Sequence, residues 1–363
     1  MINFEHEIST ALKKRSATDF IESKKKLTDG SQKIYVIGKN EQSSEIIRRY
    51  NVAGLVDDFS QSSETWYGTP IVRVENIEEN SLLINCVTSI SPIKVKNRLQ
   101  SAGLENVLQV SELISEDGDP LSLPWFVAQQ RDEMRLYQSW WNDLFARMSD
   151  DLSQKVLLDV ARFRLTADLN YMNDYDIRLK DQYFEDFMGY RNEIFVDAGG
   201  YDGDTTEEFV NRYPDYKKVY LFEPSRKNIS AAKRRLYGLR DINFRSVGLS
   251  DEQGIIYFNA DAGSASAVAK DNGELISMVT LDEELHDEEI TFIKMDLEGW
   301  EINALRGAEK TIKKSKPKLA IAVYHAAKDF REIPKYVLDV NPEYKIYLRH
   351  YTQGWSETVM FFL

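Results

Sequence analysis

Residues 194–205 read IFVDAGGYDGDT, and this stretch sets the fold that we expect for the C-terminal half of the chain. The apolar run 194–197 predicts a buried strand, and residues 205–212 predict a helix. Glycines in the turn between them allow the backbone to approach a ligand closely. Such turns lie at the carboxyl edge of a doubly wound parallel sheet, where small molecules bind. The stretch therefore predicts a ligand-binding strand-turn-helix unit.

The alternation of strand and helix continues downstream of this turn. Further strands are predicted at 218–222, 242–247, 290–296, 319–324, 344–349 and 358–362, with a helix at 225–236 and a small hairpin strand at 255–259. Only a short turn at 353–354 joins the last two strands, and a parallel crossover needs far more chain. We therefore expect an α/β sheet whose last two strands pair antiparallel.

A second, smaller α/β pattern precedes this half of the chain. Strands are predicted at 33–37, 52–56, 81–87 and 107–110, with helices at 43–50 and 92–102. The predicted segments are a helical lead-in (1–29), a Rossmann-like accessory domain (30–118), a helical aromatic-rich linker (119–190) and the C-terminal domain (191–363). In the linker, the spacing of Tyr137, Trp141 and Phe145 predicts one buried helix face, with a substrate lid or dimer face as the alternative.

Composition excludes several classes of protein. The 363 residues carry 46 Lys and Arg against 59 Asp and Glu, a formal net charge of −13. This acidic excess argues against nucleic-acid binding, which needs a positive surface. The single cysteine, Cys86, excludes an intrachain disulfide and suits a reducing, cytoplasmic location. No apolar run approaches the roughly 20 residues of a membrane span, and the N-terminus has no signal-peptide pattern.

Acidic side chains surround the predicted glycine turn. Asp197, Asp202 and Asp204 would repel a pyrophosphate seated on the helix N-terminus, so a dinucleotide is disfavoured. A cation without phosphates fits better, and S-adenosylmethionine has a sulfonium, an ammonium and an unphosphorylated ribose. Asp204 and Glu207 also have the spacing of a capping box. Glu223 ends the next strand, where an acid accepts hydrogen bonds from ribose hydroxyls.

Charged residues also gather where three later strands end. Lys294, Asp296 and Glu298 alternate onto one side of a strand, and charges there are costly unless they are paired or functional. An ion pair of Lys294 is the structural alternative. His325 and His350 end the two following strands, and this position makes both of them candidate functional residues.

With these residues placed, the C-terminal half resembles the FkbM family of S-adenosylmethionine-dependent methyltransferases. The motifs are Val196-Asp197-Ala198-Gly199 with Gly203 and Thr205, Phe222-Glu223-Pro224, Thr280-Leu281-Asp282, IKMDLEGWE at 293–301, Tyr324-His325, Ile333-Pro334 and YLRHY at 347–351. The resemblance covers about residues 181–363, and Gly200 stands where the family more often has alanine. It implies a class I methyltransferase fold, which has seven strands with the last one inserted antiparallel.

The resemblance also implies an activity, O-methylation of a hydroxyl on a carbohydrate, glycan or related metabolite, as in polysaccharide biosynthesis. The residues expected to hold S-adenosylmethionine are Asp197, Gly199, Tyr201, Gly203, Thr205, Glu223 and Asp296. His325 or Asp296 is expected to act as base, while Glu298 and His350 orient the acceptor. No resident metal is expected, and the alternative is a divalent ion on Asp296, Glu298 and His325.

Two other functions stay open. The first is an NAD- or nucleotide-sugar-binding enzyme that uses the accessory domain, although Gly38, Asn40 and Ser43 stand where a nucleotide fingerprint has three glycines. Residues 52–58 and 68–71 are loosely similar to the small Rossmann-like domain of sugar acyltransferases. The second is a cofactor-binding assembly module without catalysis. The partner is expected to be a small-molecule or glycan acceptor, and a homo-oligomer is left open.

Overall fold

The computed structural model describes residues 3–13, 17–60, 64–258 and 274–363. The chain divides into two compact units, which are described separately here. Unit 1 comprises 1–145, 155–177 and 351–356, and unit 2 comprises 146–154, 178–350 and 357–363. The four-part division expected from the sequence stays a prediction. None of the helices in the described ranges is long and apolar enough to cross a membrane.

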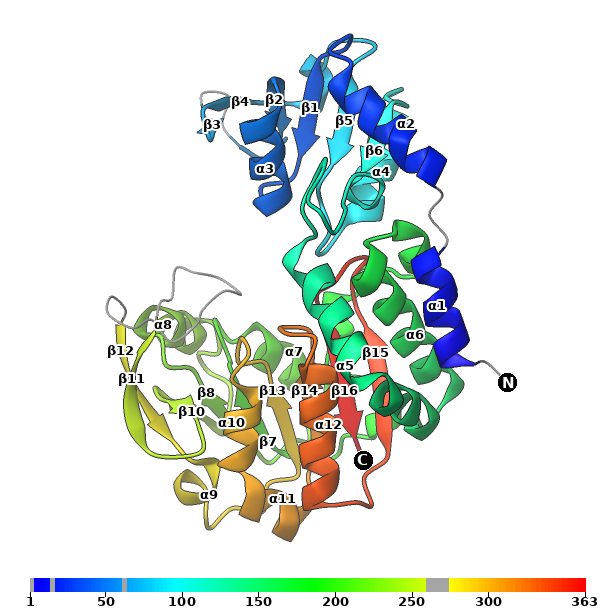
Figure 1. The fold of residues 1–363 in the computed structure, drawn as a ribbon. Helices are drawn as coiled ribbons and strands as arrows, with labels where there is room; N and C mark the ends of the chain where they lie inside the picture. The colour runs from blue at the N-terminus through cyan, green and yellow to red at the C-terminus, as the bar shows by residue number, and fades with distance from the viewer. Residues whose placement is uncertain (1–2, 14–16, 61–63, 259–273) are drawn as a thin grey trace. The chain divides into compact units, whose positions relative to one another are not determined.

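A six-stranded sheet with the order β3-β4-β2-β1-β5-β6 organises the N-terminal part of unit 1 (Figure 1). Its strands are β1 (Ile34–Ile37), β2 (Val52–Val56), β3 (Thr65–Trp66), β4 (Thr69–Val72), β5 (Leu82–Asn85) and β6 (Val107–Gln109). All neighbours pair parallel except β3 and β4. The four strands predicted in this region are confirmed. Two strands were not predicted: β3 has only two residues, and Pro70 interrupts the strand pattern of β4.

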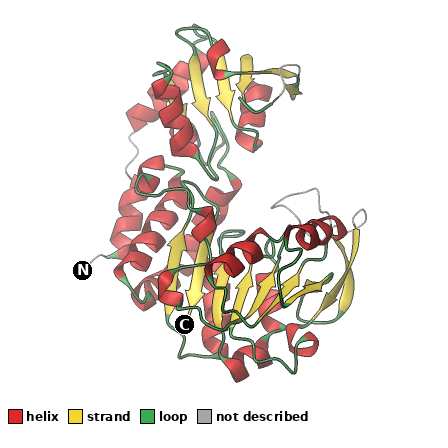
Figure 2. Cartoon of the chain, turned by 180° about the vertical axis from the view of Figure 1, so that it is seen from behind, coloured by secondary structure: helices red, strands yellow, loops and turns green. Residues whose placement is uncertain are grey.

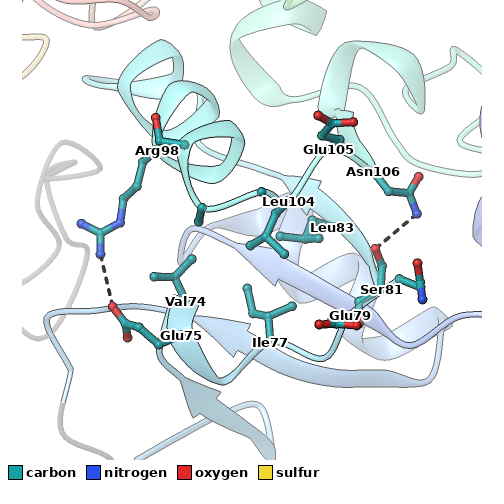
Figure 3. A pocket seen from close by; sticks show the side chains of 14 residues that line it. Val74, Glu75, Ile77, Glu79, Ser81, Leu83, Arg98, Leu104, Glu105 and Asn106 are labelled. Carbon is teal, nitrogen blue, oxygen red and sulfur yellow. Dashed lines mark hydrogen bonds and ion pairs between the residues drawn. The ribbon is translucent and has the colours of Figure 1, made fainter.

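Helices of unit 1 include α1 (Phe4–Lys13), α2 (Ala17–Thr28), α3 (Glu41–Arg49) and α4 (Pro92–Ser101). Beside α4 lies a cavity of about 880 Å³ (Figure 3). Its apolar lining includes Val74 and Leu83 of the buried core, and Arg98 at its rim lies 3.9 Å from Glu75 and 2.7 Å from Asp58. None of the predicted site residues lines this cavity.

Two long helices, α5 (Trp125–Arg147) and α6 (Asp151–Thr166), follow the accessory sheet. Trp141 and Phe145 are buried against Phe4 of α1, as predicted, with ring centroids 6.5 and 5.3 Å away. The prediction that Tyr137 shares this buried face is wrong, because Tyr137 is 40% exposed. The backbone leaves helical geometry at Tyr137 itself, with φ −133° and ψ 27°, and this kink breaks the helical periodicity.

After α6, the predicted helical pattern up to residue 188 does not hold. The structure has short 3₁₀ turns there instead, at Leu169–Met172, Leu179–Asp181 and Asp186–Met188. Between the last two turns, the aromatic side chains of Tyr183 and Phe184 are buried. This irregular segment brings Gln182 and Tyr183 to the site described below.

Unit 2 is built on a seven-stranded sheet with the order β15-β16-β14-β13-β7-β8-β9. The strands are β7 (Ile194–Ala198), β8 (Lys218–Phe222), β9 (Ile242–Arg245), β13 (Phe292–Met295), β14 (Lys318–Ala322), β15 (Ile346–His350) and β16 (Thr358–Phe362). From β9 to β14 neighbours pair parallel, whereas β16 runs antiparallel to both β14 and β15. The predicted sheet with its reversed final strand is confirmed.

Helices cover both faces of this sheet (Figure 2). They are α7 (Asp204–Arg212), α8 (Arg226–Arg235), α9 (Leu281–Glu284), α10 (Glu301–Arg306), α11 (Glu309–Ser315) and α12 (Asp329–Val340). A smaller sheet with the order β10-β12-β11 consists of β10 (Gly248–Leu249), β11 (Gly254–Phe258) and β12 (Glu274–Val279). The strand predicted at 255–259 corresponds to β11, and Asn259 lies outside the described residues. The prediction did not include β12.

Buried aromatic rings fix the centre of the large sheet. Phe195 of β7 lies opposite Phe292 of β13 in the register, with ring centroids 4.5 Å apart, and Phe209 of α7 packs 4.4 Å from Phe195. All three side chains are fully buried. Burying a phenylalanine contributes about 1.5–3 kcal/mol, so this cluster holds β7 and β13 side by side. Their carboxyl ends carry the site.

Candidate functional site

A cavity of about 420 Å³ lies at the carboxyl ends of the parallel strands β7, β8, β13 and β14, entirely within unit 2. The residues that line it are Gln182, Tyr183, Gly199, Tyr201, Asp204, Thr205, Glu223, Pro224, Asn228, Lys294, Asp296, Leu297, Glu298, Tyr324 and Glu357. Of the predicted site residues, Gly199, Tyr201, Thr205, Glu223, Asp296 and Glu298 line the cavity, and Asp197, Gly203, His325 and His350 do not. Six of the predicted site residues therefore lie at one cavity, and their roles stay predictions.

The glycine turn is shaped by contacts with the rest of the sheet. Gly199 has φ +77°, and a Cβ atom there would lie 2.0 Å from the backbone oxygen of Asp296. The N–H groups of Gly199 and Gly200 both donate to the Phe222 carbonyl at 3.0 Å. Two features therefore require glycine at residue 199: its left-handed backbone conformation and the close contact with the backbone of Asp296.

This close approach gives a testable prediction. Gly199→Ala should destabilise unit 2 by more than the ~1–3 kcal/mol of a left-handed non-glycine residue, because the clash adds to the backbone strain. Gly238→Ala is the matched control: Gly238 has φ +84° and no atom within 4 Å of an added Cβ. Urea unfolding measures both changes. Equal destabilisation of the two variants would show that the contact with Asp296 is unimportant.

Lys294 and Asp197 form a buried ion pair behind the turn. The Lys294 Nζ lies 3.1 Å from Asp197 Oδ1 and donates to the Gly199 carbonyl at 2.7 Å, while the Thr206 hydroxyl donates to Asp197 at 2.7 Å. Burial lowers the pKa of Lys294, but the charges of Asp197 and Asp296 outweigh it and leave this pKa raised. The ion pair considered as the alternative for Lys294 is thus present. Asp197 is fully buried and supports the turn from behind.

Glu223 lies beside the turn, after β8. Its side chain accepts hydrogen bonds from the backbone N–H groups of Tyr201 at 3.1 Å and Ser225 at 2.8 Å. Burial raises the pKa of Glu223, although these N–H groups oppose the shift. A carboxylate has about four lone-pair sites, so Glu223 keeps acceptor capacity toward the cavity.

The start of α7 differs from the prediction. Gly203, with φ +86°, is the N-cap of α7 and takes no side-chain capping bond, so the capping box expected from Asp204 and Glu207 is wrong. Asp204 instead begins the helix, and its carboxylate accepts the Thr205 N–H at 2.7 Å. The left-handed conformation of Gly203 makes the turn one residue shorter than the capping-box interpretation requires. Asp204 thereby lines the cavity.

Two tyrosines hold Asp296 in the wall of the cavity. Tyr183 donates its hydroxyl to Asp296 Oδ2 at 2.7 Å, and the Tyr324 hydroxyl lies 3.3 Å from both carboxylate oxygens. Glu357 lies nearby and accepts a hydrogen bond from Gln182 at 2.6 Å. Burial raises the pKa of Glu357 to about 7.

Gln182, Tyr183 and Glu357 were not predicted from the sequence as site residues. Tyr324 belongs to the Tyr324-His325 motif of the family resemblance, and this motif is the sequence feature that could have marked it as a site residue. Tyr183 stands in the aromatic-rich segment, where the spacing indicates packing only. No local pattern marks Gln182 or Glu357, because they reach the cavity from irregular segments before β7 and after β15.

His325 lies behind the cavity wall. Its Nε2 is 3.4 Å from Asp296 Oδ1 and 3.4 Å from Glu298 Oε2, and its Nδ1 is 3.2 Å from Glu301 Oε1. Burial lowers the pKa of His325, but Glu301 and the other two carboxylates raise it well above the usual value. Asp296 lines the cavity and His325 does not, so this arrangement favours Asp296 over His325 as a base.

His350 does not reach the cavity. It is buried at the end of β15, and its Nδ1 lies 2.8 Å from the Thr358 hydroxyl of β16. The sequence predicts an acceptor-orienting role because His350 ends a strand at the same edge as His325. However, β16 is inserted between β14 and β15 and moves His350 one strand further away. We therefore leave His350 out of the proposed site.

Three residues in strained backbone conformations line this cavity. Tyr201, Glu298 and Glu357 have φ values of +43°, +54° and +65°, although none is a glycine. Such conformations cost roughly 1–3 kcal/mol each and cluster at functional sites. Their convergence on one cavity supports a binding or catalytic role for it.

In unit 1, the corresponding turn after β1 is differently built. Asn40 caps α3 by accepting the Ser43 N–H at 3.0 Å, and the Ser43 hydroxyl accepts the Asn40 N–H at 3.0 Å. The Asn40 side chain thus takes the Ser43 N–H, one of the donors at the helix end on which a nucleotide phosphate would sit. The turn thus offers no support for the nucleotide-binding alternative.

The sheet with its reversed strand has the arrangement of the class I methyltransferase fold, and the cavity lies at its carboxyl edge. Comparison with protein families matches residues 197–345 to the methyltransferase FkbM domain. This part of the chain is therefore similar to the FkbM methyltransferase family. A search of curated proteins found no significant match.

Solved structures with a similar fold include an FkbM methyltransferase from Methylobacillus flagellatus, with 22% identity, 99% of both chains covered and a TM-score of 0.76. An rRNA methylase from Streptococcus thermophilus has 19% identity over 49% of this chain and 90% of its own, with a TM-score of 0.33. Aeropyrum pernix fibrillarin, solved with bound S-adenosyl-L-methionine, has 9% identity over 51% and 76%, with a TM-score of 0.33. The first similarity shows a shared fold along essentially the whole chain.

Proposed function

We propose that this protein transfers a methyl group from S-adenosylmethionine to a hydroxyl group of a carbohydrate, glycan or related metabolite in the cytoplasm. The observation that carries the proposal is the charge of the cavity. Five carboxylates line it, those of Asp204, Glu223, Asp296, Glu298 and Glu357. The single cation among its lining residues, Lys294, is already paired with Asp197. A cationic ligand is thus favoured over a phosphorylated one.

The volume of the cavity and two features of its lining also support S-adenosylmethionine as the ligand. The cavity volume of about 420 Å³ lies within the range typical of small-molecule sites. Glu223 has acceptor capacity for ribose hydroxyls, and the turn at Gly199 presents backbone with no side chain in the way. When bound, S-adenosylmethionine would supply an electrophilic methyl group.

The residues on the other side of the cavity would then handle the acceptor. The Tyr183 and Tyr324 hydroxyls hold the Asp296 carboxylate in place, so it is preorganised to receive the proton of the acceptor hydroxyl. Glu298 is 41% exposed and can accept a hydrogen bond from a second hydroxyl of the acceptor. Carboxylates in this arrangement suit a sugar, whose neighbouring hydroxyls are all donors.

Ligand-induced thermal stabilisation tests the proposal. S-adenosylmethionine and S-adenosylhomocysteine should each raise the Tm, with a stabilisation of ~2.7 kcal/mol at about 100 times Kd. NAD and UDP-sugars should have no effect. Glu223→Gln should weaken S-adenosylmethionine binding about ten- to hundredfold, because a hydrogen bond to a charged group is worth ~1.5–3 kcal/mol.

The matched control is Glu252→Gln, since Glu252 is exposed and outside the cavity. This variant should bind S-adenosylmethionine like the unmodified protein. Stabilisation by NAD or a UDP-sugar, with none by S-adenosylmethionine, would reject the proposal in favour of a nucleotide-dependent enzyme.

A further inference from the structure

The carboxylates around His325 form a set of donor atoms that points to one spot. Asp296 Oδ1 and Glu298 Oε2 each lie 3.4 Å from His325 Nε2. Ligand atoms placed 2.0–2.1 Å from an octahedral ion stand about 3 Å from one another, so the observed spacing is close to that of a coordination shell. One donor atom from each of Asp296, Glu301 and His325 also lies within 4.8 Å of the others.

The histidine ring itself is the second, independent observation. The His325 side chain is 3% exposed, and its Nε2 makes no hydrogen bond of good geometry with any described residue. A buried polar group without such a bond is costly unless another partner satisfies it. Nε2 points toward the carboxylates of Asp296 and Glu298, which is where an ion would complete its coordination.

Glu301 contacts the other ring nitrogen of His325. Its Oε1 lies 3.2 Å from His325 Nδ1, on the side of the ring opposite Nε2. Glu301 is 1% exposed, and the Leu297 N–H donates to the same oxygen at 2.7 Å, which fixes the carboxylate. Metal-bound histidines characteristically place their second nitrogen on such a carboxylate, which orients the ring.

We propose that Asp296, Glu298 and the Nε2 of His325 bind a divalent cation such as Mg²⁺ or Mn²⁺, with Glu301 as the positioning residue. Two carboxylates and one imidazole form a mixed oxygen and nitrogen site that leaves coordination positions free. Asp296 and Glu298 also line the cavity, so these open positions face the place proposed for the acceptor. The ion would hold the acceptor oxygen and favour its deprotonation, a role that rests on the proposed methyl transfer.

Calorimetric titration with Mn²⁺ tests the site without any activity measurement. The whole protein is first treated with EDTA and desalted to remove bound metal. One Mn²⁺ per chain is expected, displaced by excess Mg²⁺. Glu298→Gln should weaken Mn²⁺ binding by about tenfold or more, and Glu301→Gln by about 10- to 100-fold, the usual effect of losing such a partner. Glu298 is exposed, so Glu298→Gln should keep the fold.

Asp287→Asn is the matched control, because Asp287 forms an exposed carboxylate-histidine pair with His286 at 2.9 Å, away from the cavity. Its Mn²⁺ affinity should equal that of the unmodified protein. Absence of Mn²⁺ binding at millimolar concentration, or equal affinity in all variants, would overturn the site. S-adenosylmethionine binding to the same metal-free sample is measured in parallel. If this sample does not bind S-adenosylmethionine but binds Mn²⁺, the proposed function is rejected and the metal site is retained.

Discussion

Asp296→Asn should lower kcat about 10²- to 10⁴-fold, the range that a positioned general base contributes. Asparagine has nearly the same shape and can still accept the hydrogen bond from Tyr183, which lies 2.7 Å from Asp296 Oδ2. It lacks the charge and the basicity needed to take a proton from the acceptor. Steady-state methyl transfer, followed with labelled S-adenosylmethionine, measures the effect.

Cofactor affinity separates this catalytic role from a binding role. The Kd for S-adenosylmethionine of the Asp296→Asn variant should change far less than kcat, because Glu223 and the Gly199 turn are intact. Asp287→Asn serves as the control for the loss of one surface carboxylate. If S-adenosylmethionine affinity fell by the same factor while kcat at saturation was retained, Asp296 would be a cofactor ligand rather than the base.

Lys294→Met should destabilise unit 2 by ~3–5 kcal/mol, the usual cost of removing one partner of a buried ion pair. Asp197 would keep a fully buried charge that still accepts the hydrogen bond from the Thr206 hydroxyl but has lost its ion-pair partner. The variant also loses the hydrogen bond from Lys294 to the Gly199 carbonyl, so the turn loses an anchor. Urea unfolding gives the change in stability, and the Tm shift with S-adenosylmethionine reports on the turn.

An exposed ion pair provides the comparison. Lys313→Met removes a pair with Glu309 on the surface of α11, where both side chains are about half exposed, and should cost at most about 1 kcal/mol. The double variant Asp197→Asn with Lys294→Met should recover part of the lost stability, since it no longer buries an unpaired charge. A Lys294→Met variant as stable as the unmodified protein would rule out the structural role of this pair.

Much of the fold could be predicted because its signals are local. The apolar runs that form β7, β8, β13 and β14 are continuous and bounded by turns, and the short link between β15 and β16 permits only antiparallel pairing. The elements that escaped prediction, such as β3 and β10, have only two residues each. Their pairing depends on neighbouring strands rather than on any pattern of their own.

The candidate site also has residues that could be predicted from the sequence and residues that could not. Gly199, Glu223 and Asp296 directly follow parallel strands, and the carboxyl ends of such strands meet at one edge, so their convergence was predictable. Tyr137 and His350 show where the inference fails. A kink turns Tyr137 outward, and the insertion of β16 separates His350 from the cavity.

The amino-acid sequence by itself determined the parallel sheet, its reversed last strand and the acidic glycine turn, because hydrophobic periodicity and chain length act over short distances. Only the tertiary structure decided that Lys294 neutralises Asp197, that Tyr183 and Glu357 reach the cavity, and that three carboxylates surround His325. Those contacts join residues far apart in the chain. Their energies depend on burial and on distances of a few ångströms, which no local pattern encodes.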